Sequence, residues 1–119
     1  MNHTPQFTDS LPDGMPDAAA LLGELRATDP GGRAAIVARY PVLEVLAPAP
    51  VLGEWLGLTK RSIYQARTRR RPDGELEWPD EDETILGRKM WRFSSVVLHR
   101  ASAPARGWNL RSEAREGAK

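Results

Sequence analysis

The sequence predicts a mainly α-helical fold of the α+β class with one small β-hairpin. Apolar residues recur every three or four positions over much of 17–70, which is the spacing of amphipathic helices. Clusters of Pro and Gly at 29–32 and 72–74 interrupt that pattern and mark turns. Residues 84–93 differ, since a Gly-Arg pair separates two short runs that contain aliphatic and aromatic residues, as in a hairpin.

The N-terminal third contains three expected helices. Asp17 is placed to cap a helix through about residue 28, because its carboxylate can accept a hydrogen bond from the first turn. A second helix is expected over 33–40 and a third over 41–46, with Pro41 in its first turn. Residues 1–16 hold several Pro residues and little apolar content, so we expect disorder there.

Residues 50–67 carry the pattern of a helix-turn-helix. Two short helices that cross steeply need a small residue where they touch, and Gly53 supplies it. The turn between them favours a residue that adopts positive φ without strain, and Gly57 stands there, with the apolar Ile63 further on. The first helix is expected over about 51–56. The second is expected over 60–70, with Thr59 as its N-cap.

A β-hairpin and a last helix follow the helix-turn-helix. The expected strands are 84–86 and 89–93, with Gly87-Arg88 as the tight turn. Ser94 is expected to cap a helix that ends near residue 100. The order of elements therefore predicts a winged helix-turn-helix with an additional N-terminal helical segment.

The predicted domain organisation has four parts. They are a disordered N-terminus (1–16), a helical extension (17–47), the winged helix-turn-helix domain (48–101) and a flexible C-terminal tail (102–119). The apolar residues of the extension suit either a core or a dimer surface, because the core of so small a domain is limited.

Charge is strongly segregated along the second half of the chain. The net charge of +1 conceals six basic residues and no acid in 60–71, seven acids and no base in 72–84, and six basic residues and no acid in 85–111. Attraction to phosphate acts over roughly a Debye length, about 10 Å at moderate salt. The positive field is therefore local, and it coincides with the second helix of the motif and with the hairpin.

Several functional classes are not supported by the sequence. The chain has no cysteine, which excludes disulfides and thiolate metal sites, and no cluster of His, Asp and Glu has metal-ligand spacing. We identify no catalytic residue, no metal ligand and no cofactor site, so we do not expect an enzyme. With no long apolar run and no secretory signal, we expect a cytoplasmic, nucleoid-associated protein without a membrane partner.

Short blocks in a fixed order carry a family resemblance. They are Leu52, Trp55-Leu56-Gly57-Leu58-Thr59, Ile63-Tyr64, Trp78-Pro79-Asp80 and Leu86-Gly87-Arg88-Lys89-Met90-Trp91-Arg92-Phe93. With these blocks, residues 51–100 resemble the excisionase-type, MerR-like DNA-binding domains of bacteria, phages and plasmids. The resemblance implies sequence-specific duplex binding, with the second helix in the major groove and the Gly-Arg, Trp-Arg hairpin as a wing on phosphates or in the minor groove. The connector 72–84 is longer and more acidic than a minimal member needs.

The predicted DNA contacts come from the second helix and the hairpin tip. They are Thr59, Lys60, Arg61, Ser62, Tyr64, Gln65, Thr68, Arg69, Arg88 and Lys89. Geometry allows Gln65 to bind adenine and Arg61 to bind guanine in a bidentate manner. The alternative interpretation of these residues is a solvated polar face. The late arginines 67 and 69–71 suit either phosphate contact or the carbonyls at the helix end.

Three functions from different classes fit this sequence. The leading hypothesis is a sequence-specific double-stranded DNA-binding protein, most simply a transcriptional repressor that acts as a homodimer or a cooperative oligomer on DNA. One alternative is an excisionase-like or partition accessory factor that bends the DNA of a mobile element. The other is a protein-interaction module without DNA binding, which the acidic run 73–83 suggests. That run is otherwise expected to be a solvated loop.

Overall fold

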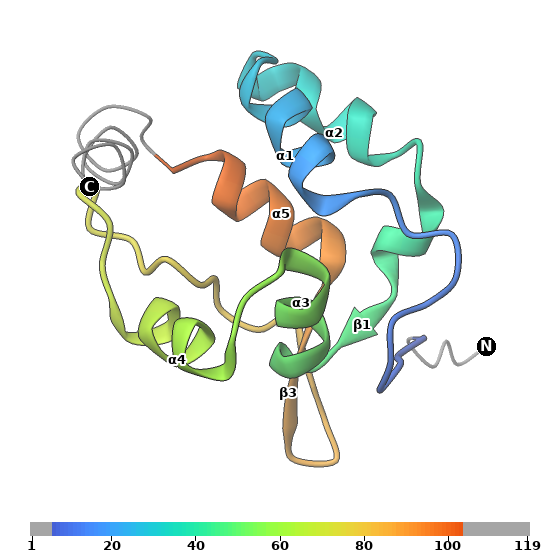
Figure 1. Ribbon diagram of the computed structural model, residues 1–119, viewed down its shortest axis with the longest axis vertical. Helices are drawn as coiled ribbons and strands as arrows, with labels where there is room; N and C mark the ends of the chain where they lie inside the picture. The colour runs from blue at the N-terminus through green and yellow to red at the C-terminus, as the bar shows by residue number, and fades with distance from the viewer. Residues whose placement is uncertain (1–5, 104–119) are drawn as a thin grey trace.

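The computed structural model describes residues 6–103 and has an α+β architecture (Figure 1). Five α-helices, two short 3₁₀ helices and a three-stranded antiparallel sheet of order β1-β3-β2 make up this part of the chain. In chain order they are α1 (Ala18–Arg26), η1 (Pro30–Gly32), α2 (Arg33–Val37), η2 (Pro41–Glu44), β1 (Leu46–Ala47), α3 (Ala49–Leu56), α4 (Lys60–Thr68), β2 (Glu83–Ile85), β3 (Arg88–Arg92) and α5 (Phe93–Ala101). Of the helices described, none has the length and apolar character needed to cross a membrane. Our expectations for 1–5 and for the tail over 104–119 lie outside the described residues.

One hydrophobic core joins the N-terminal helices to the rest of the chain. Leu25 of α1, Leu52 of α3 and Phe93 of α5 are fully buried in it. Trp55 packs edge-to-face on Phe93, with ring centroids 5.4 Å apart. The larger apolar residues of 17–47 that lie inside this core are Leu21, Leu25, Ile36, Val37 and Leu43, and Leu22 and Tyr40 pack against it. A helix as short as α1 is marginal alone and packs here on α3 and α5. The expected division between 47 and 48 stays a prediction.

The expectation of disorder over 1–16 is wrong for residues 6–16. Gln6 and Thr8 exchange backbone hydrogen bonds of 2.9 Å with Leu46, so this segment runs beside β1. The carbonyl of Pro16 accepts a 2.9 Å hydrogen bond from the indole of Trp55. Composition alone could not predict this order, because the hydrogen-bond partners of the segment are the backbone of β1 and the indole of Trp55, which are distant in the sequence.

The α-helix expected over 41–46 is not formed. The chain forms the 3₁₀ helix η2 and then the strand β1, in which Leu46 pairs with Arg92 and Ala47 with Trp91 of β3. Pro48 disfavours helical geometry only in Ala47, the residue before it, whereas the pairing of Leu46 and Ala47 with β3 draws this segment into the sheet. A strand of two residues is too short to leave an alternating pattern in the sequence.

The α3–turn–α4 segment follows the prediction closely. Gly57 ends α3 with φ 76°, and the Leu58 N–H donates to the carbonyl of Gly53 at 2.7 Å. Thr59 caps α4 by accepting a 3.1 Å hydrogen bond from the Ser62 N–H. Helix α4 ends at Thr68 rather than at residue 70, since Arg69 is extended and its carbonyl accepts a hydrogen bond from the acidic connector.

The hairpin turn lies one residue earlier than predicted. Ile85 pairs directly with Arg88, so Leu86 and Gly87 are the two central residues, with φ 51° and 80°. Positive φ at both centres is the geometry of a type I′ turn, which matches the twist of the strands. Ser94 is not a cap, because α5 begins at Phe93 and the serine is buried. The carboxylate of Asp82 instead accepts a 2.8 Å hydrogen bond from the Arg92 N–H at the start of α5.

Candidate nucleic-acid interface

The outer face of α4 is exposed, polar and free of acidic residues. Ile63 and Ala66 point into the core on the opposite side. At about 100° of rotation per residue, the outward residues span an arc of about 160°. In order around the helix they are Arg67, Lys60, Tyr64, Thr68, Arg61 and Gln65. Tyr64 keeps 71% of its surface exposed, and only Gln65 of this set is partly buried.

The hydroxyl groups of some predicted contact residues form hydrogen bonds with other groups of the same helix or its cap. The Thr59 hydroxyl donates to Ser62 Oγ at 3.0 Å, in addition to its capping role. Thr68 Oγ1 donates back to the carbonyls of Tyr64 at 3.3 Å and Gln65 at 3.1 Å. These contacts fix the two ends of α4, so Thr59, Ser62 and Thr68 position the helix whether or not they also touch a ligand.

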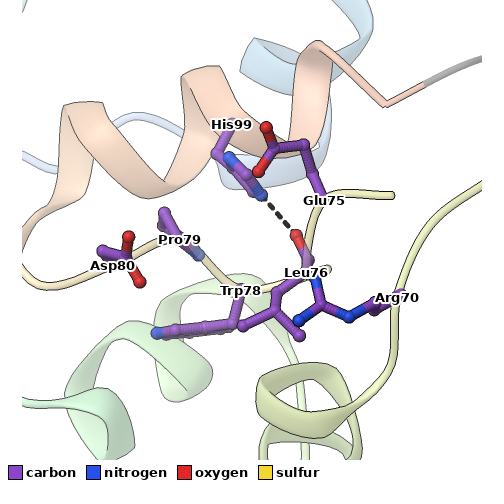
Figure 2. Close-up of a pocket in the computed structure, with 7 residues that line it drawn as sticks. All are labelled: Arg70, Glu75, Leu76, Trp78, Pro79, Asp80 and His99. Atoms are coloured by element: carbon purple, nitrogen blue, oxygen red, sulfur yellow. Dashed lines mark hydrogen bonds between the residues drawn. The ribbon is translucent and has the colours of Figure 1, made fainter. Parts of the chain in front are cut away.

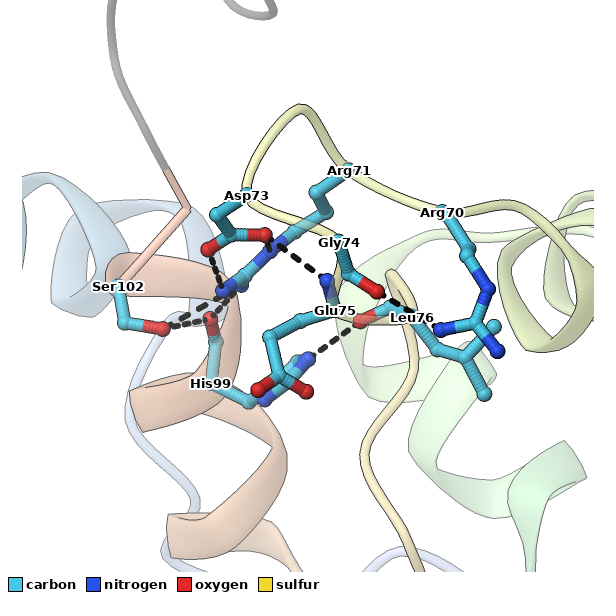
Figure 3. Close-up of polar contacts among 8 residues, drawn as sticks. All are labelled: Arg70, Arg71, Asp73, Gly74, Glu75, Leu76, His99 and Ser102. Carbon is cyan, nitrogen blue, oxygen red and sulfur yellow. Dashed lines mark hydrogen bonds and ion pairs between the residues drawn. The ribbon is translucent and has the colours of Figure 1, made fainter.

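Arg71 is a structural residue rather than part of the exposed basic surface (Figure 3). Its side chain is buried at 6% exposure and reaches α5, where it donates to the His99 carbonyl at 2.9 Å and to Ser102 Oγ at 3.3 Å. It also pairs with Asp73 at 2.6 Å. The hydrogen bond from the Arg71 side chain lowers the pKa of the Asp73 carboxyl below its ordinary value.

The two preceding arginines are exposed but engaged with the connector. Arg70 donates to the Gly74 carbonyl at 2.7 Å (Figure 3). Arg69, one of the predicted contacts, lies 3.9 Å from the Glu77 carboxylate and keeps more than half of its side chain exposed. Arg70 and Arg71 thus donate to carbonyls of the connector and of α5 rather than to the carbonyls at the end of α4, which were the alternative to phosphate contact.

Arg67 belongs to the exposed surface, although it is absent from the predicted contacts. Its guanidinium lies over the ring of Trp91, 5.6 Å from the centroid, so the side chain is held against β3. The sequence contained a signal, because Arg67 follows Lys60 and Tyr64 by seven and three positions and shares their helix face. The contact with Trp91 depends on the fold and could not be read from that spacing.

The hairpin brings its two cations to different neighbours. Lys89 lies on the same face of β3 as Trp91, and so toward α4. Arg88 lies on the other face and forms a 3.0 Å ion pair with Asp9 of the N-terminal segment. An open hollow of about 370 Å³ between α3, α4 and the hairpin is lined by both cations and by Arg67. The fold thus places the C-terminal end of α4, with Arg67, beside the hairpin. Lys60 and Arg61 lie at the N-terminal end of the same helix.

The acidic connector is only partly the solvated loop that we expected. Glu77 is buried, and its N–H donates to the Arg69 carbonyl at 2.9 Å. Asp82 lies 3.6 Å from the Arg92 guanidinium, which also lies 3.7 Å from Glu44. These carboxylates neutralise cations of the same chain, and Arg92 is therefore not part of the exposed basic surface.

A second hollow of about 370 Å³ lies between the connector and α5 (Figure 2). His99 points into it, with Nε2 2.6 Å from the Leu76 carbonyl. The indole N–H of Trp78, another wall residue, has no hydrogen-bond partner among the described residues. Within residues 6–103 no three His, Asp or Glu side chains are grouped to hold a metal ion. The hollow is a polar surface cleft with no nucleophile–base pair.

Comparison with known proteins adds no relative to these observations. No protein-family model matches the chain, and no curated protein and no solved structure matches it either.

Proposed function

We propose that this chain is a sequence-specific double-stranded DNA-binding protein of the winged helix-turn-helix type. In this proposal α4 is the recognition helix and enters the major groove. The β2–β3 hairpin is the wing and lies on the backbone or in the adjacent minor groove. The observation that carries the proposal is the acid-free, outward arc of α4 beside a hairpin whose Lys89 faces the same side.

Electrostatics supports a polyanionic ligand at this surface. Lys60, Arg61 and Lys89 make no ion pair with any described residue, in contrast to Arg71, Arg88 and Arg92. Cations without internal partners are available to replace the counterions condensed on a duplex. Asp73, Glu77 and Asp82 of the connector are paired with Arg71, Arg69 and Arg92, so these three carboxylates are not free to pair with Lys60, Arg61 or Lys89.

The shape and chemistry of α4 support base readout as well as phosphate contact. An α-helix fits the major groove, where guanine presents two acceptors and adenine an acceptor and a donor. Arg61 and Gln65 lie one turn apart on the outer arc, and each has the donor geometry for one of these edges. Tyr64 lies between Lys60 and Thr68 on the arc and adds an exposed ring for contact with the sugar–phosphate backbone or a thymine methyl group.

The simplest biological role is a transcriptional repressor that occludes a promoter. Three of the seven carboxylates of the acidic run that suggested the protein-interaction alternative, Asp73, Glu77 and Asp82, pair with arginines of the same chain, so part of that charge is engaged internally. Leu21, Leu25, Ile36 and Val37 of the N-terminal helices lie in the core, so these side chains are not available for a dimer surface. Any self-association on DNA would then use another surface.

Fluorescence anisotropy with labelled duplexes tests the proposal. The probes are a duplex from upstream of the protein's own coding sequence, a duplex selected from a randomised pool, and a scrambled duplex. We expect the selected duplex to bind on the order of 10³-fold more tightly than the scrambled one.

A matched pair of variants separates the proposed interface from a general charge effect. Arg61→Ala removes one charge from α4. Arg39→Ala removes one charge just after α2, where Arg39 pairs with Glu24. Helix α2 lies away from the hairpin (Figure 1). Only Arg61→Ala should relax the sequence preference. Equal weakening by both variants, or no duplex binding at low salt, would contradict the proposal.

A further inference from the structure

The tip of the hairpin carries an apolar side chain that the fold does not use. Leu86 is 96% exposed, the highest value among the large hydrophobic residues described. It also has φ 51°, and it is the only non-glycine residue with positive φ in residues 6–103. Leu86 and Gly87 form the turn of the β2–β3 hairpin, and this hairpin projects from the body of the protein (Figure 1).

Both properties of Leu86 are unfavourable for the isolated protein. At positive φ the Cβ atom crowds the backbone, and Asn, Asp or Gly are the residues that tolerate the first centre of a type I′ turn. An exposed leucine also leaves its apolar surface in water. Asn at this position would relieve both costs without changing the turn. Backbone strain of this kind clusters at ligand-binding positions, so the strained and exposed Leu86 indicates a contact with a ligand.

The surroundings of Leu86 indicate the chemistry of that ligand. Arg88 and Lys89 follow it on the same hairpin, and with Gly87 they line the hollow that also contains Arg67. An apolar tip flanked by cations suits a polyanion whose interior is apolar, which describes the stacked bases of a duplex behind their phosphates. The flanking charges would contact phosphate while the leucine reaches past them.

We infer that Leu86 is a wedge that enters the minor groove, separates two stacked base pairs and bends the DNA. This inference rests on the proposed function, because it needs α4 in the neighbouring major groove. Aliphatic side chains inserted between base steps partially unstack them and kink the duplex toward the major groove. The wedge also adds a source of specificity, since pyrimidine–purine steps such as TA unstack most easily.

The test compares the wild-type chain with Leu86→Asn and Leu86→Met on the selected duplex. Asn removes the apolar side chain and the strain, whereas Met keeps an apolar side chain of similar size. The bend is measured by energy transfer between dyes at the two ends of the duplex. Unstacking is measured by 2-aminopurine fluorescence at successive positions. Urea unfolding of each free protein checks that the variants are folded.

The expected bend for the wild-type chain is on the order of 20–90°, the range of wedge-kinked duplexes. Leu86→Met should keep the bend and the fluorescence rise at one step. Leu86→Asn should still bind the duplex but lose both signals, although its midpoint in urea should rise. A preference for a TA step over a GC step at that position should disappear in the same variant.

The results that overturn this inference differ from those that overturn the proposed function. If the wild-type chain and Leu86→Asn bind and bend the duplex equally, the wedge is wrong while DNA binding stands. If the wild-type chain binds no duplex, the wedge and the proposed function are both contradicted. Vesicles of anionic lipid test another ligand for Leu86. If Leu86→Asn reduces binding to these vesicles but does not change the bend of the duplex, the wedge is again contradicted.

Discussion

Gly53 provides the sharpest test of how α3 crosses α4. A Cβ atom at this position would overlap Cδ1 of Ile63 and would lie 2.9 Å from its Cγ1 and 3.5 Å from the Leu58 carbonyl oxygen. The substitution Gly53→Ala therefore adds a methyl group where the two helices touch. Gly23 in α1 is the matched control, because a Cβ there meets nothing within 4 Å.

Two opposing terms set the size of the effect. Replacing a glycine within a helix by alanine favours folding by roughly 0.5–1 kcal/mol. Forcing an extra methyl group into a packed contact costs about 1–3 kcal/mol. For Gly53→Ala the two terms together give a net loss of up to about 2.5 kcal/mol from the free energy of unfolding, with about 1 kcal/mol as the central value. For Gly23→Ala only the gain applies, so that variant should be more stable than the wild type.

Urea denaturation followed by tryptophan fluorescence measures both variants, since Trp55, Trp78 and Trp91 are buried in the folded chain. A double-mutant cycle identifies the contact. Ile63→Val alone should cost about 0.5–1.5 kcal/mol. The same change in the Gly53→Ala background should cost less or even stabilise, because it removes the Cδ1 atom that overlaps the new methyl group.

The reasoning is refuted if Gly53→Ala stabilises the protein as much as Gly23→Ala does. That result would mean that the helices do not approach closely at Gly53. Independent effects of Gly53→Ala and Ile63→Val, with no coupling between them, would contradict the assigned contact even if each variant is destabilised.

The remaining predictions concern DNA affinity and pH. In anisotropy titrations Arg61→Ala should cost roughly 1–3 kcal/mol on the selected duplex and relax discrimination at one base pair; an equal loss on every sequence would assign Arg61 to phosphate instead. Asp9→Asn should release Arg88 from an exposed ion pair and tighten duplex binding by up to about fivefold, with a steeper salt dependence; unchanged binding would show that Asp9 does not compete with phosphate. The hydrogen bond from Arg71 lowers the pKa of Asp73 in the folded state, so the stabilisation from this carboxylate is present above the ordinary aspartate pKa of 3.8 and is lost as the pH falls through the lower folded pKa. Acid unfolding of Asp73→Asn should therefore show a weaker pH dependence in that range, and an identical profile would contradict the pairing.

The local signals in the sequence predicted where α1, α3 and α4 begin or turn, but not the length of α2, which ends at Val37, nor the 3₁₀ helix and strand in place of the helix expected over 41–46. The caps Asp17 and Thr59 and the turn at Gly57 are confirmed, because each depends on a residue and its nearest neighbours. The errors have a common cause. The strand β1 and the ordered segment 6–16 exist because they pair with residues distant in the sequence, and such pairing leaves no local pattern.

The exposed basic surface was predictable only in part. Helical spacing was sufficient to find the outward arc of α4, including Lys60 and Arg61. It could not show that Arg71 turns inward to α5, that Arg67 rests on Trp91, or that Arg88 pairs with Asp9. Each of these depends on where another element packs. The shift of the hairpin turn to Leu86-Gly87 followed from register, which depends on the pairing of whole strands.

Interference by base methylation tests the central claim, that α4 reads the major groove of a duplex. Dimethyl sulfate modifies guanine N7 in the major groove and adenine N3 in the minor groove, and bound and free DNA are then compared at each position. We predict that N7 methylation within one short run of base pairs blocks binding, and that Arg61→Ala removes the block at one guanine. Binding that tolerates N7 methylation at every position of the selected duplex would contradict the claim.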